Sequence, residues 1–294
     1  MTTVQRDSIS NSDYGYNAAL SLLIYNTTTD CYEFYAYGDW HEFACAVISG
    51  GCDGQTTMTD SRDSKVYNIV KIGTQCWMAE NLAYLPAVHD NSTFDSRGTS
   101  SLSAYGVYGY DGSDTATAKS QANYSTYGVL YNWWAAMQDS SSCNGTGSSQ
   151  PECSTPVQGI CPDGWHLPSH YEFTALERAI CTSGSCASDF PYDESTTGYR
   201  GTNEGSKLAK DTTLWTAGTL LSNDSIGTSG FSVLPGGLRG TSGTFFNESL
   251  IAYLWSSTEN ATNAWNRSWN FSTSTVLRGN FNKKSGFSVR CVRN

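Results

Sequence analysis

The stretch Ala264-Trp-Asn-Arg-Ser-Trp-Asn-Phe-Ser272 alternates large and small side chains along its length. An alternation of period two is typical of a β-strand, because successive side chains point to opposite faces of a sheet. One face would carry Trp265, Arg267, Trp269 and Phe271. The other face would carry Asn266, Ser268, Asn270 and Ser272. The stretch therefore predicts a strand that is anchored on one face and directs small polar groups outward on the other.

The segment around this strand differs from the rest of the chain in charge. Residues 260–294 contain no Asp or Glu, although the whole protein has a formal net charge of -10 at pH 7. Small polar groups beside aromatic rings suit adaptable recognition, because rings supply contact area while Ser and Asn supply hydrogen bonds. We therefore expect a ligand-contacting surface here. The alternative is a plain final hairpin whose polar groups are merely solvated.

Composition limits the fold class and the partners. The chain has 294 residues, 38% hydrophobic and 15% charged, with 28 Gly, 18 Tyr, 11 Phe and 9 Trp. Few charges with many aromatics and glycines favour a loop-rich α+β fold with short strands. The acidic balance argues against nucleic acid as a partner. The longest apolar run, residues 18–25, is far below the ~20 residues that a spanning helix needs, so no membrane insertion is expected.

Ten cysteines, an even number, lie mostly in Gly/Ser/Asp-rich sequence. No CxxC pair or His/Cys zinc spacing occurs, so disulfides are the better interpretation. Proximity in the sequence suggests three pairs, which are Cys31 with Cys45, Cys143 with Cys153, and Cys181 with Cys186. Disulfides indicate an extracellular, cell-surface or virion-surface location.

The chain is expected to contain two domains. Residues 1–57 read as a small N-terminal β module, with a hairpin around the polar turn 26–30 and a third short strand near Trp40. Such a module would pack on the main domain or associate with copies of itself. Residues 58–294 form the main domain, with long ordered loops over 86–126. Two helices are predicted there, one over 127–137 and one that starts after the N-cap Ser169, with Glu172 completing a capping box.

Seven ordered blocks over residues 58–294 resemble the Fib_succ_major ("major paralogous domain") family. They are Ile72-Gly-Thr-Gln-Cys-Trp-Met-Ala-Glu-Asn-Leu82, Tyr127-Gly-Val-Leu-Tyr-Asn-Trp-Trp-Ala135, Cys161-Pro-Asp-Gly-Trp-His-Leu-Pro-Ser169, Gly205-Ser-Lys-Leu208, Phe231-Ser-Val-Leu-Pro-Gly-Gly-Leu-Arg-Gly240, Leu254-Trp-Ser-Ser-Thr-Glu259 and Gly286-Phe-Ser-Val-Arg-Cys-Val-Arg293. The resemblance implies a C-type-lectin-like domain of the formylglycine-generating-enzyme type. Some members are variable proteins of diversity-generating retroelements, whose C-terminal segment is mutated to change ligand specificity.

The resemblance places a variable region at about 255–290 of this chain. In such systems only template adenines are randomised, so Asn codons become many residue types but never Trp, Lys, Glu, Gln or Met. The expected ligand-binding positions are Asn260, Asn263, Asn266, Ser268, Asn270, Ser272, Leu277, Gly279, Asn280, Phe281 and Asn282. The expected scaffold residues are Trp255, Trp265, Arg267 and Trp269. The ligand would be a protein or glycan on a target cell surface.

The same blocks argue against an enzyme. Formylglycine-generating enzymes use reactive cysteines, but Cys161 and Cys291 lie in scaffold blocks and resemble a structural bridge. No nucleophile elbow, zinc-protease motif or phosphate loop occurs. A static glycan-binding module is the alternative, in which an exposed Trp265 or Trp269 would stack on a sugar. Four other tryptophans are expected in the core, namely Trp133, Trp134, Trp165 and Trp255.

Neither a metal nor a cofactor is expected. His166 and His170 are four residues apart, but without a carboxylate partner they suit a surface or capping role better than a metal pair. The calcium-binding triplets of C-type lectins do not occur. Asp53-Gly54 and residues 111–114 are ordinary turn sequences, which leave room for a structural calcium ion.

Overall fold

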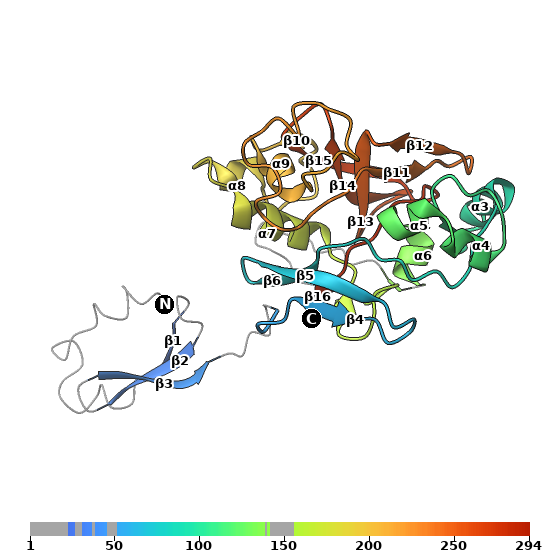
Figure 1. Ribbon diagram of the computed structural model, residues 1–294. Coiled ribbons are helices and arrows are strands. Elements are labelled where there is room, and N and C mark those ends of the chain that lie inside the picture. Colours follow the sequence, from blue (N-terminus) through green and yellow to red (C-terminus); the bar gives the residue numbers. More distant parts are fainter. Residues whose placement is uncertain (1–22, 27–30, 37–38, 46–51, 139, 142–155) are drawn as a thin grey trace. The chain divides into compact units, whose positions relative to one another are not determined.

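The computed structural model describes residues 23–26, 31–36, 39–45, 52–138, 140–141 and 156–294 (Figure 1). The chain divides into two compact units, Met1–Gly50 and Gly51–Asn294. The division precedes the predicted boundary at residue 57, because Cys52 is bonded to Cys76 of the second unit. Strand β4 (Thr57–Thr59) also belongs to the second unit, where it pairs with β5 (Val66–Ile72).

The first unit contains a three-stranded antiparallel sheet, as the sequence predicts. Its strands are β1 (Leu23–Asn26), β2 (Cys31–Ala36) and β3 (Asp39–Cys45), in that order across the sheet. The register of β2 and β3 places Cys31 directly opposite Cys45. This backbone position is the one that the predicted disulfide requires. The predicted pair Cys143–Cys153 lies outside the described residues.

The second unit is built on two main sheets, shown one above the other in Figure 1. The upper, six-stranded sheet has the order β10-β15-β14-β13-β11-β12. Its strands are β10 (Gly198–Arg200), β11 (Gly236–Arg239), β12 (Phe245–Glu248), β13 (Ile251–Asn260), β14 (Asn263–Asn270) and β15 (Val276–Asn282). The lower sheet adds β6 (Gln75–Met78), β16 (Val292–Arg293) and β9 (Trp165–His166) to β4 and β5. A small pair, β7 (Tyr105–Gly106) and β8 (Leu130–Tyr131), stands apart.

Helices are short and more numerous than the two predicted. Among the described helices the longest is α7 (His170–Ile180), which begins after Ser169 with the predicted capping box. The others are α3 (Asn91–Thr99), α4 (Thr115–Lys119), α5 (Ala122–Tyr127), α6 (Trp133–Met137), α8 (Cys186–Asp189) and α9 (Glu204–Leu208). Three of them lie in the 86–126 segment for which loops were expected. Its Asp90 and Asp114 side chains cap α3 and α4, a signal that the prediction overlooked.

The predicted helix over 127–137 is wrong in its first half. Gly128 has φ 74, and a Cβ there would lie 2.7 Å from the carbonyl oxygen of Leu82. The chain therefore leaves the helical path at this glycine and forms β8. A new helix, α6, starts only after Asn132, whose side chain accepts a hydrogen bond from the Ala135 amide.

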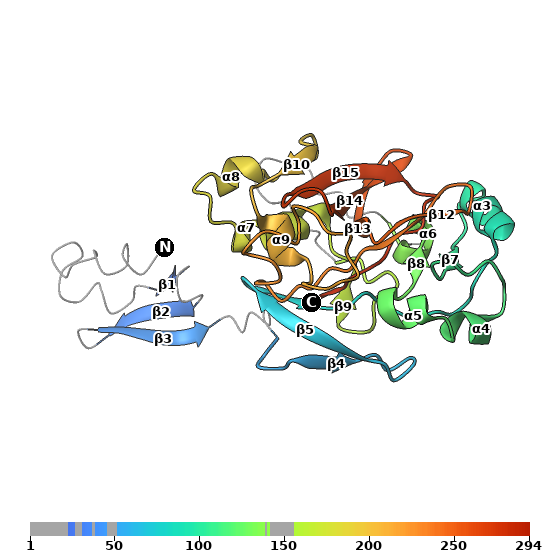
Figure 2. The same cartoon turned by 45° about the horizontal axis from the view of Figure 1, so that its top comes forward.

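Two hydrophobic clusters lie on opposite sides of the six-stranded sheet. One joins Trp269 and Leu254 to Phe173 of α7 and Trp77 of the lower sheet. Helix α7 makes the connection, because it contacts both β5 and β13–β14 (Figure 2). The other cluster gathers the remaining core side chains, including Trp255, Trp133, Trp165 and Phe287. Three of the four predicted core tryptophans are thus buried, while Trp134 packs on this cluster from its edge.

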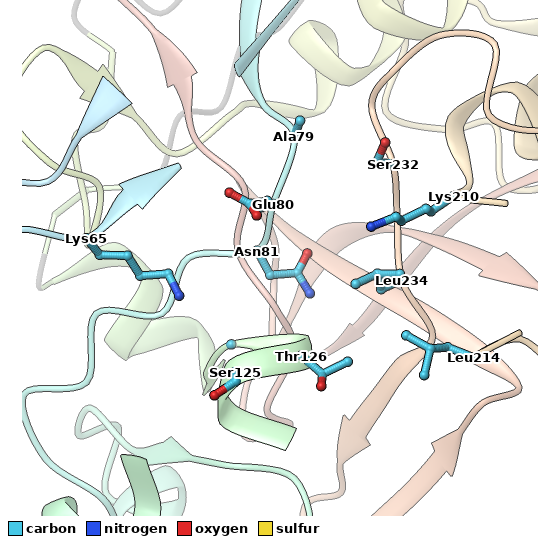
Figure 3. Close-up of a pocket in the computed structure, with 11 residues that line it drawn as sticks. Lys65, Ala79, Glu80, Asn81, Ser125, Thr126, Lys210, Leu214, Ser232 and Leu234 are labelled. Carbon is cyan, nitrogen blue, oxygen red and sulfur yellow. The ribbon is translucent and has the colours of Figure 1, made fainter. Parts of the chain in front are cut away.

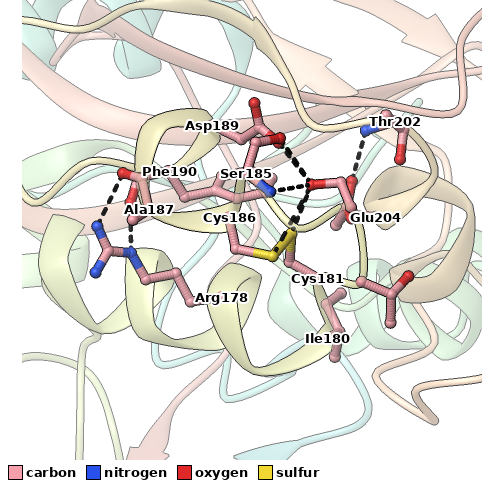
Figure 4. Close-up of a disulfide and its surroundings, with 12 residues drawn as sticks. Arg178, Ile180, Cys181, Ser185, Cys186, Ala187, Asp189, Phe190, Thr202 and Glu204 are labelled. Carbon is pink, nitrogen blue, oxygen red and sulfur yellow. Dashed lines mark hydrogen bonds between the residues drawn. A yellow bond between two sulfur atoms is a disulfide. The ribbon is translucent and has the colours of Figure 1, made fainter.

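Disulfides hold the second unit together. The predicted bridges Cys161–Cys291 and Cys181–Cys186 are both present, and Cys52–Cys76 adds a third. The short bridge closes the turn after α7, where Arg178 donates to the carbonyls of Ala187 and Phe190 (Figure 4). Such bridges are typical of an oxidising, extracellular-type environment. Among the described residues, no helix is long and apolar enough to span a membrane.

Candidate functional site

Residues 264–270 of the opening stretch belong to β14, the central strand of an antiparallel triplet. Phe271 and Ser272, predicted on the same strand, lie in the turn after it. On one side Ser268 lies opposite Tyr253 of β13, and on the other side it lies opposite Leu277 of β15. Directly opposed residues share a face of the sheet. Asn266 and Ser268 therefore share their face with the Tyr253 and Leu277 side chains. Trp265, Arg267 and Trp269 project from the opposite face, toward α7.

The α7 side of the sheet fixes the scaffold. Trp265, Arg267 and Trp269 are at most 1% exposed. The Trp265 ring lies 4.1 Å from the His170 ring, centroid to centroid. The Arg267 guanidinium forms a buried ion pair with Glu177 of α7. The prediction that large side chains anchor this face is confirmed, and none of the three can stack on a ligand in solvent.

The prediction that Asn266 and Ser268 point into solvent is wrong. Their exposures are 2% and 3%. The Phe287 ring stacks on Trp255 of the same face at 4.1 Å and on Tyr253 at 4.8 Å. The chain after β15 therefore covers the middle of the face, and the small side chains lie below the rings. Phe287 is 19 residues beyond Ser268 and 21 beyond Asn266, so alternation within β14 could not reveal this cover.

The rim of the same face remains open at β15 and β10. Tyr199 is 53% exposed and Phe281 is 39% exposed, while Leu277 is half-buried. Register places Tyr199 beside Leu277, and the Phe281 ring lies 6.2 Å from that of Tyr253. We call Tyr199, Tyr253, Leu277 and Phe281 the rim patch. Two of its members, Leu277 and Phe281, are predicted site residues.

Sequence reasoning missed Tyr199. It lies between Gly198 and Arg200 in a Ser/Thr/Gly-rich segment that carries no strand pattern. Its place at the site depends on β10 pairing with β15, across more than 70 residues of chain. The sequence signal for Tyr199 was a single aromatic residue in a polar segment. Because the chain contains 18 Tyr, many of them in similar segments, this signal could not identify Tyr199 as a site residue.

Four of the other predicted positions form a second, polar group at the end of the triplet, namely Asn260, Asn263, Asn280 and Asn282. Asn260 and Asn282 are exposed, and both lie opposite Asn263 in the register. The Asn263 amide donates to the Asn280 side chain over 3.0 Å. This group belongs to the α7 side of the sheet, so the predicted positions divide between two faces at one sheet end.

The turn after β14 uses two further predicted positions. The Asn270 side chain accepts from both the backbone amide and the hydroxyl of Ser272, at 3.0 and 2.9 Å. Gly279 lies between Leu277 and Phe281, opposite Asn266. A Cβ on Gly279 would meet only the Asn266 side-chain oxygen, at 3.4 Å, so this position has space for a side chain.

Both histidines near α7 are buried, contrary to the surface role expected for them. His166 hydrogen-bonds Glu172 at 2.5 Å and Asn294 at 2.6 Å. Burial opposes its protonation, but the Glu172 partner raises the pKa of His166 above its ordinary value. His170 lies at 3.1 Å from Arg267 and at 2.6 Å from Arg278. Burial and these two guanidinium groups hold the pKa of His170 well below its ordinary value.

We expect acid to destabilise the second unit through His170. The unfolded chain takes up a proton on this side chain near the ordinary pKa of 6.5, whereas the folded chain does not. The stabilisation is therefore complete above pH 6.5 and falls as the pH is lowered, by at most about 1.4 kcal/mol per pH unit. His166 acts in the opposite sense, because its raised pKa stabilises the fold below pH 6.5 and that contribution is lost at higher pH.

Urea unfolding of the wild type and His170→Gln across this pH range separates the two contributions. The variant should lose less stability on acidification than the wild type. Equal slopes in the two proteins would contradict the assignment.

The turn sequences considered for calcium have other roles. Asp111 accepts hydrogen bonds from the backbone and side chain of Asn91, at 2.6 and 2.8 Å. Asp114 caps α4. In the part of the chain that the structure describes, no three His, Cys, Asp or Glu side chains gather as a metal site.

Comparison with known proteins gives one match. A protein-family model described as Fibrobacter succinogenes major domain (Fib_succ_major) matches residues 70–293. This range contains all seven blocks identified in the sequence, together with the whole β13–β15 triplet. Neither a curated protein nor a solved structure matches the chain.

Proposed function

The chain belongs to the Fibrobacter succinogenes major domain family, and we propose that it is a non-enzymatic binding protein of a cell or virion surface. Its scaffold would be a C-type-lectin-like domain of the formylglycine-generating-enzyme type. A diversity-generating retroelement would vary the C-terminal strands and thereby change the ligand, a protein or glycan on a target cell. Neither nucleic acid nor membrane insertion enters this proposal.

The observation that carries the proposal is the separation of residue types around β14 and β15. Among the types that adenine mutagenesis of Asn codons cannot produce, Trp255, Trp265, Trp269 and Lys283 are buried. Glu259 and Lys284 are half-buried and form ion pairs. Most of the predicted binding positions, which carry types that this mutagenesis can produce, are exposed or half-buried, and Asn260, Ser272, Phe281 and Asn282 are exposed. Asn266 and Ser268 are the exceptions, because adenine mutagenesis can produce these residue types and yet both side chains are buried. Variation at the rim would change side chains without disturbing the core.

The rim chemistry fits recognition on a rigid backbone. Tyr199 and Phe281 offer ring surface with few rotatable bonds, and the neighbouring asparagines offer donors and acceptors. Because β15 pairs with β14, and β10 pairs with β15, the strands that carry Phe281 and Tyr199 are ordered before a ligand arrives. Binding would then lose little conformational entropy.

Two matched libraries test whether the rim tolerates variation. Randomising Leu277, Gly279 and Phe281 should leave most clones folded, whereas randomising Trp255, Trp265 and Trp269 should leave few. The reason is burial, since a Trp→Ala change in a core costs about 3–5 kcal/mol. Surface display with protease challenge measures the folded fraction. Equal survival of the two libraries would contradict the division into scaffold and variable positions.

The retroelement itself has a genomic test. A reverse transcriptase gene should lie nearby, with a near-copy of the sequence encoding residues 255–290 that differs only at adenines. If both are absent, the diversification claim fails, and a static surface-binding domain remains.

A static glycan-binding module is the second candidate, favoured by the exposed rings of the rim patch. Tyr199→Ala should then abolish binding on a glycan array while the fold is kept, because Tyr199 is half exposed. Trp269→Ala is unsuitable for this test, because Trp269 is fully buried and its loss would damage the core. Unchanged glycan binding by Tyr199→Ala and Phe281→Ala would count against this candidate.

A further inference from the structure

A separate pocket of about 240 Å³ opens on the second unit, and it shares no residue with the rim patch. Five segments contribute to its wall. They supply Lys65, the run 79–81, the run Ser125, Thr126 and Gly128, the pair Lys210 and Leu214, and the pair Ser232 and Leu234. The volume lies below that of drug-sized sites, so it suits a single small ligand or one unit of a chain.

The pocket carries two amines without carboxylate partners. In Figure 3, Lys65 and Lys210 enter from opposite sides, with Glu80 and Asn81 between them. Within the described chain, no carboxylate oxygen lies within ion-pair distance of either amine. Lys65 instead lies over the rings of Tyr67 and Tyr124, at 5.5 and 5.8 Å. These amines are free to meet an anion.

A third cation stands behind the pocket wall. Arg290 is fully buried, and its guanidinium donates to Asn81 Oδ1 at 2.9 Å and to the Ser232 carbonyl at 2.8 Å. A further donation goes to the carbonyl of Phe231. All three acceptors are neutral, so the hydrogen bonds do not cancel the charge. Desolvation lowers the pKa of Arg290 to about 9, although the negative charge of Glu80 opposes the shift, and the group remains a cation at neutral pH.

The positive charge of the pocket is local. The protein as a whole has a net charge of -10, so general basicity cannot account for it. Glu80 is the one acidic group in the wall, and one of its oxygens accepts the backbone amide of Asn68 at 2.8 Å. Two amines and one carboxylate favour a monoanion over a densely charged phosphate, because Glu80 would repel additional negative charge.

The neutral part of the wall suits a hydroxylated ring. Ser125 and Glu80 can exchange hydrogen bonds with ligand hydroxyls, while Leu214 and Leu234 offer an apolar side. The Asn81 amide is already committed, since its nitrogen donates to the Tyr127 carbonyl and to Ser288. It therefore keeps the wall rigid. We propose that this pocket binds a sugar acid, with the ligand carboxylate held between Lys65 and Lys210.

Titration of the full chain with sodium glucuronate tests the proposal. Saturable binding in the millimolar range is expected, and the neutral methyl ester of the same sugar should bind about tenfold more weakly. Raising the salt from about 50 to 500 mM should weaken glucuronate binding, because screening acts on the exposed amines. N-acetylneuraminate, titrated in parallel, distinguishes sialic acids from uronic acids as the preferred sugar acid.

Variants locate the binding. Lys210→Ala and Lys65→Ala should each weaken glucuronate binding about tenfold, whereas Lys71→Ala, an exposed lysine outside the pocket, should change it less than about twofold. Thermal unfolding checks that the variants remain folded. Lys210→Ala should keep its fold, because Lys210 is exposed. Equal binding of glucuronate and its ester, equal binding of glucuronate and sulfate, or equal losses in all three variants would overturn the proposal. A failure here leaves the rim patch untouched, because the two sites have separate residues.

Discussion

Removal of the Cys161–Cys291 bridge should lower the free energy of unfolding of the second unit by about 5 kcal/mol. The bridge closes a loop of 130 residues. Its main effect is to restrict the unfolded chain, and that restriction grows with the logarithm of the loop length. The bridge is also buried, since both cysteines are at most 1% exposed. The double variant Cys161→Ala/Cys291→Ala in urea, followed by tryptophan fluorescence, measures the loss.

The matched control is the Cys181–Cys186 bridge, which spans a sequence separation of 5. The same relation gives only about 2 kcal/mol for so short a loop. Fluorescence reports mainly on the second unit, because Trp40 is the one tryptophan of residues 1–50. Equal losses in the two double variants would show that loop length does not govern the effect. Native thiol titration should also find Cys161 and Cys291 unreactive.

Glu177→Gln should destabilise the second unit by about 3–5 kcal/mol, because it leaves a buried cation without its anion. Glu177 and Arg267 are 1% and 0% exposed. Arg278 lies opposite Arg267 in the register and is also fully buried. The Glu177 carboxylate thus offsets charge on two neighbouring strands. Urea unfolding of the single variant gives the magnitude.

Two further variants distinguish charge burial from loss of a contact. Asp95→Asn removes the partner of Lys284 in a partly exposed ion pair, and it should change stability little. The pair Glu177→Leu/Arg267→Met should recover part of the loss, because the Arg267 charge no longer remains uncompensated in the core, whereas the buried Arg278 charge stays there. A double variant as unstable as Glu177→Gln would show that the ion pair itself, rather than the uncompensated charge, determines the effect.

Local sequence signals predicted the parts of the fold that local interactions determine. Ser169 and Glu172 meet within one helical turn, so the start of α7 could be read directly. The prediction that Trp265, Arg267 and Trp269 share a buried face is confirmed. Successive side chains of a strand point to opposite faces in any sheet, so this property can be predicted without knowing the neighbouring strands. The family resemblance supplied Cys161–Cys291, which no spacing rule could have provided.

The errors have a common physical cause, which is packing between distant segments. Asn266 is covered because Phe287 returns over the sheet, and Tyr199 joins the site because β10 pairs with β15. In both cases tertiary packing determines which distant segment makes the contact, and the local sequence is compatible with that contact but does not specify it. The split of the asparagines between two faces has a different origin, because Asn263 and Asn266 are three residues apart in β14 and successive side chains of a strand alternate between faces. Alternation in the sequence was sufficient to predict it.

Strand β16 is the central connection of the lower sheet, because Val292 pairs with both Trp77 and His166. Its residues follow the proposed variable region in the order of synthesis. If a retroelement diversifies this region, a gene copy that acquires a frameshift within residues 260–282 would therefore also lose Cys291 and the strand that joins β6 to β9. Translation would yield a chain unable to close its lower sheet, and proteolysis would remove it. Under the proposed function the gene order would act as a filter, since only copies that keep their reading frame would reach the folded state.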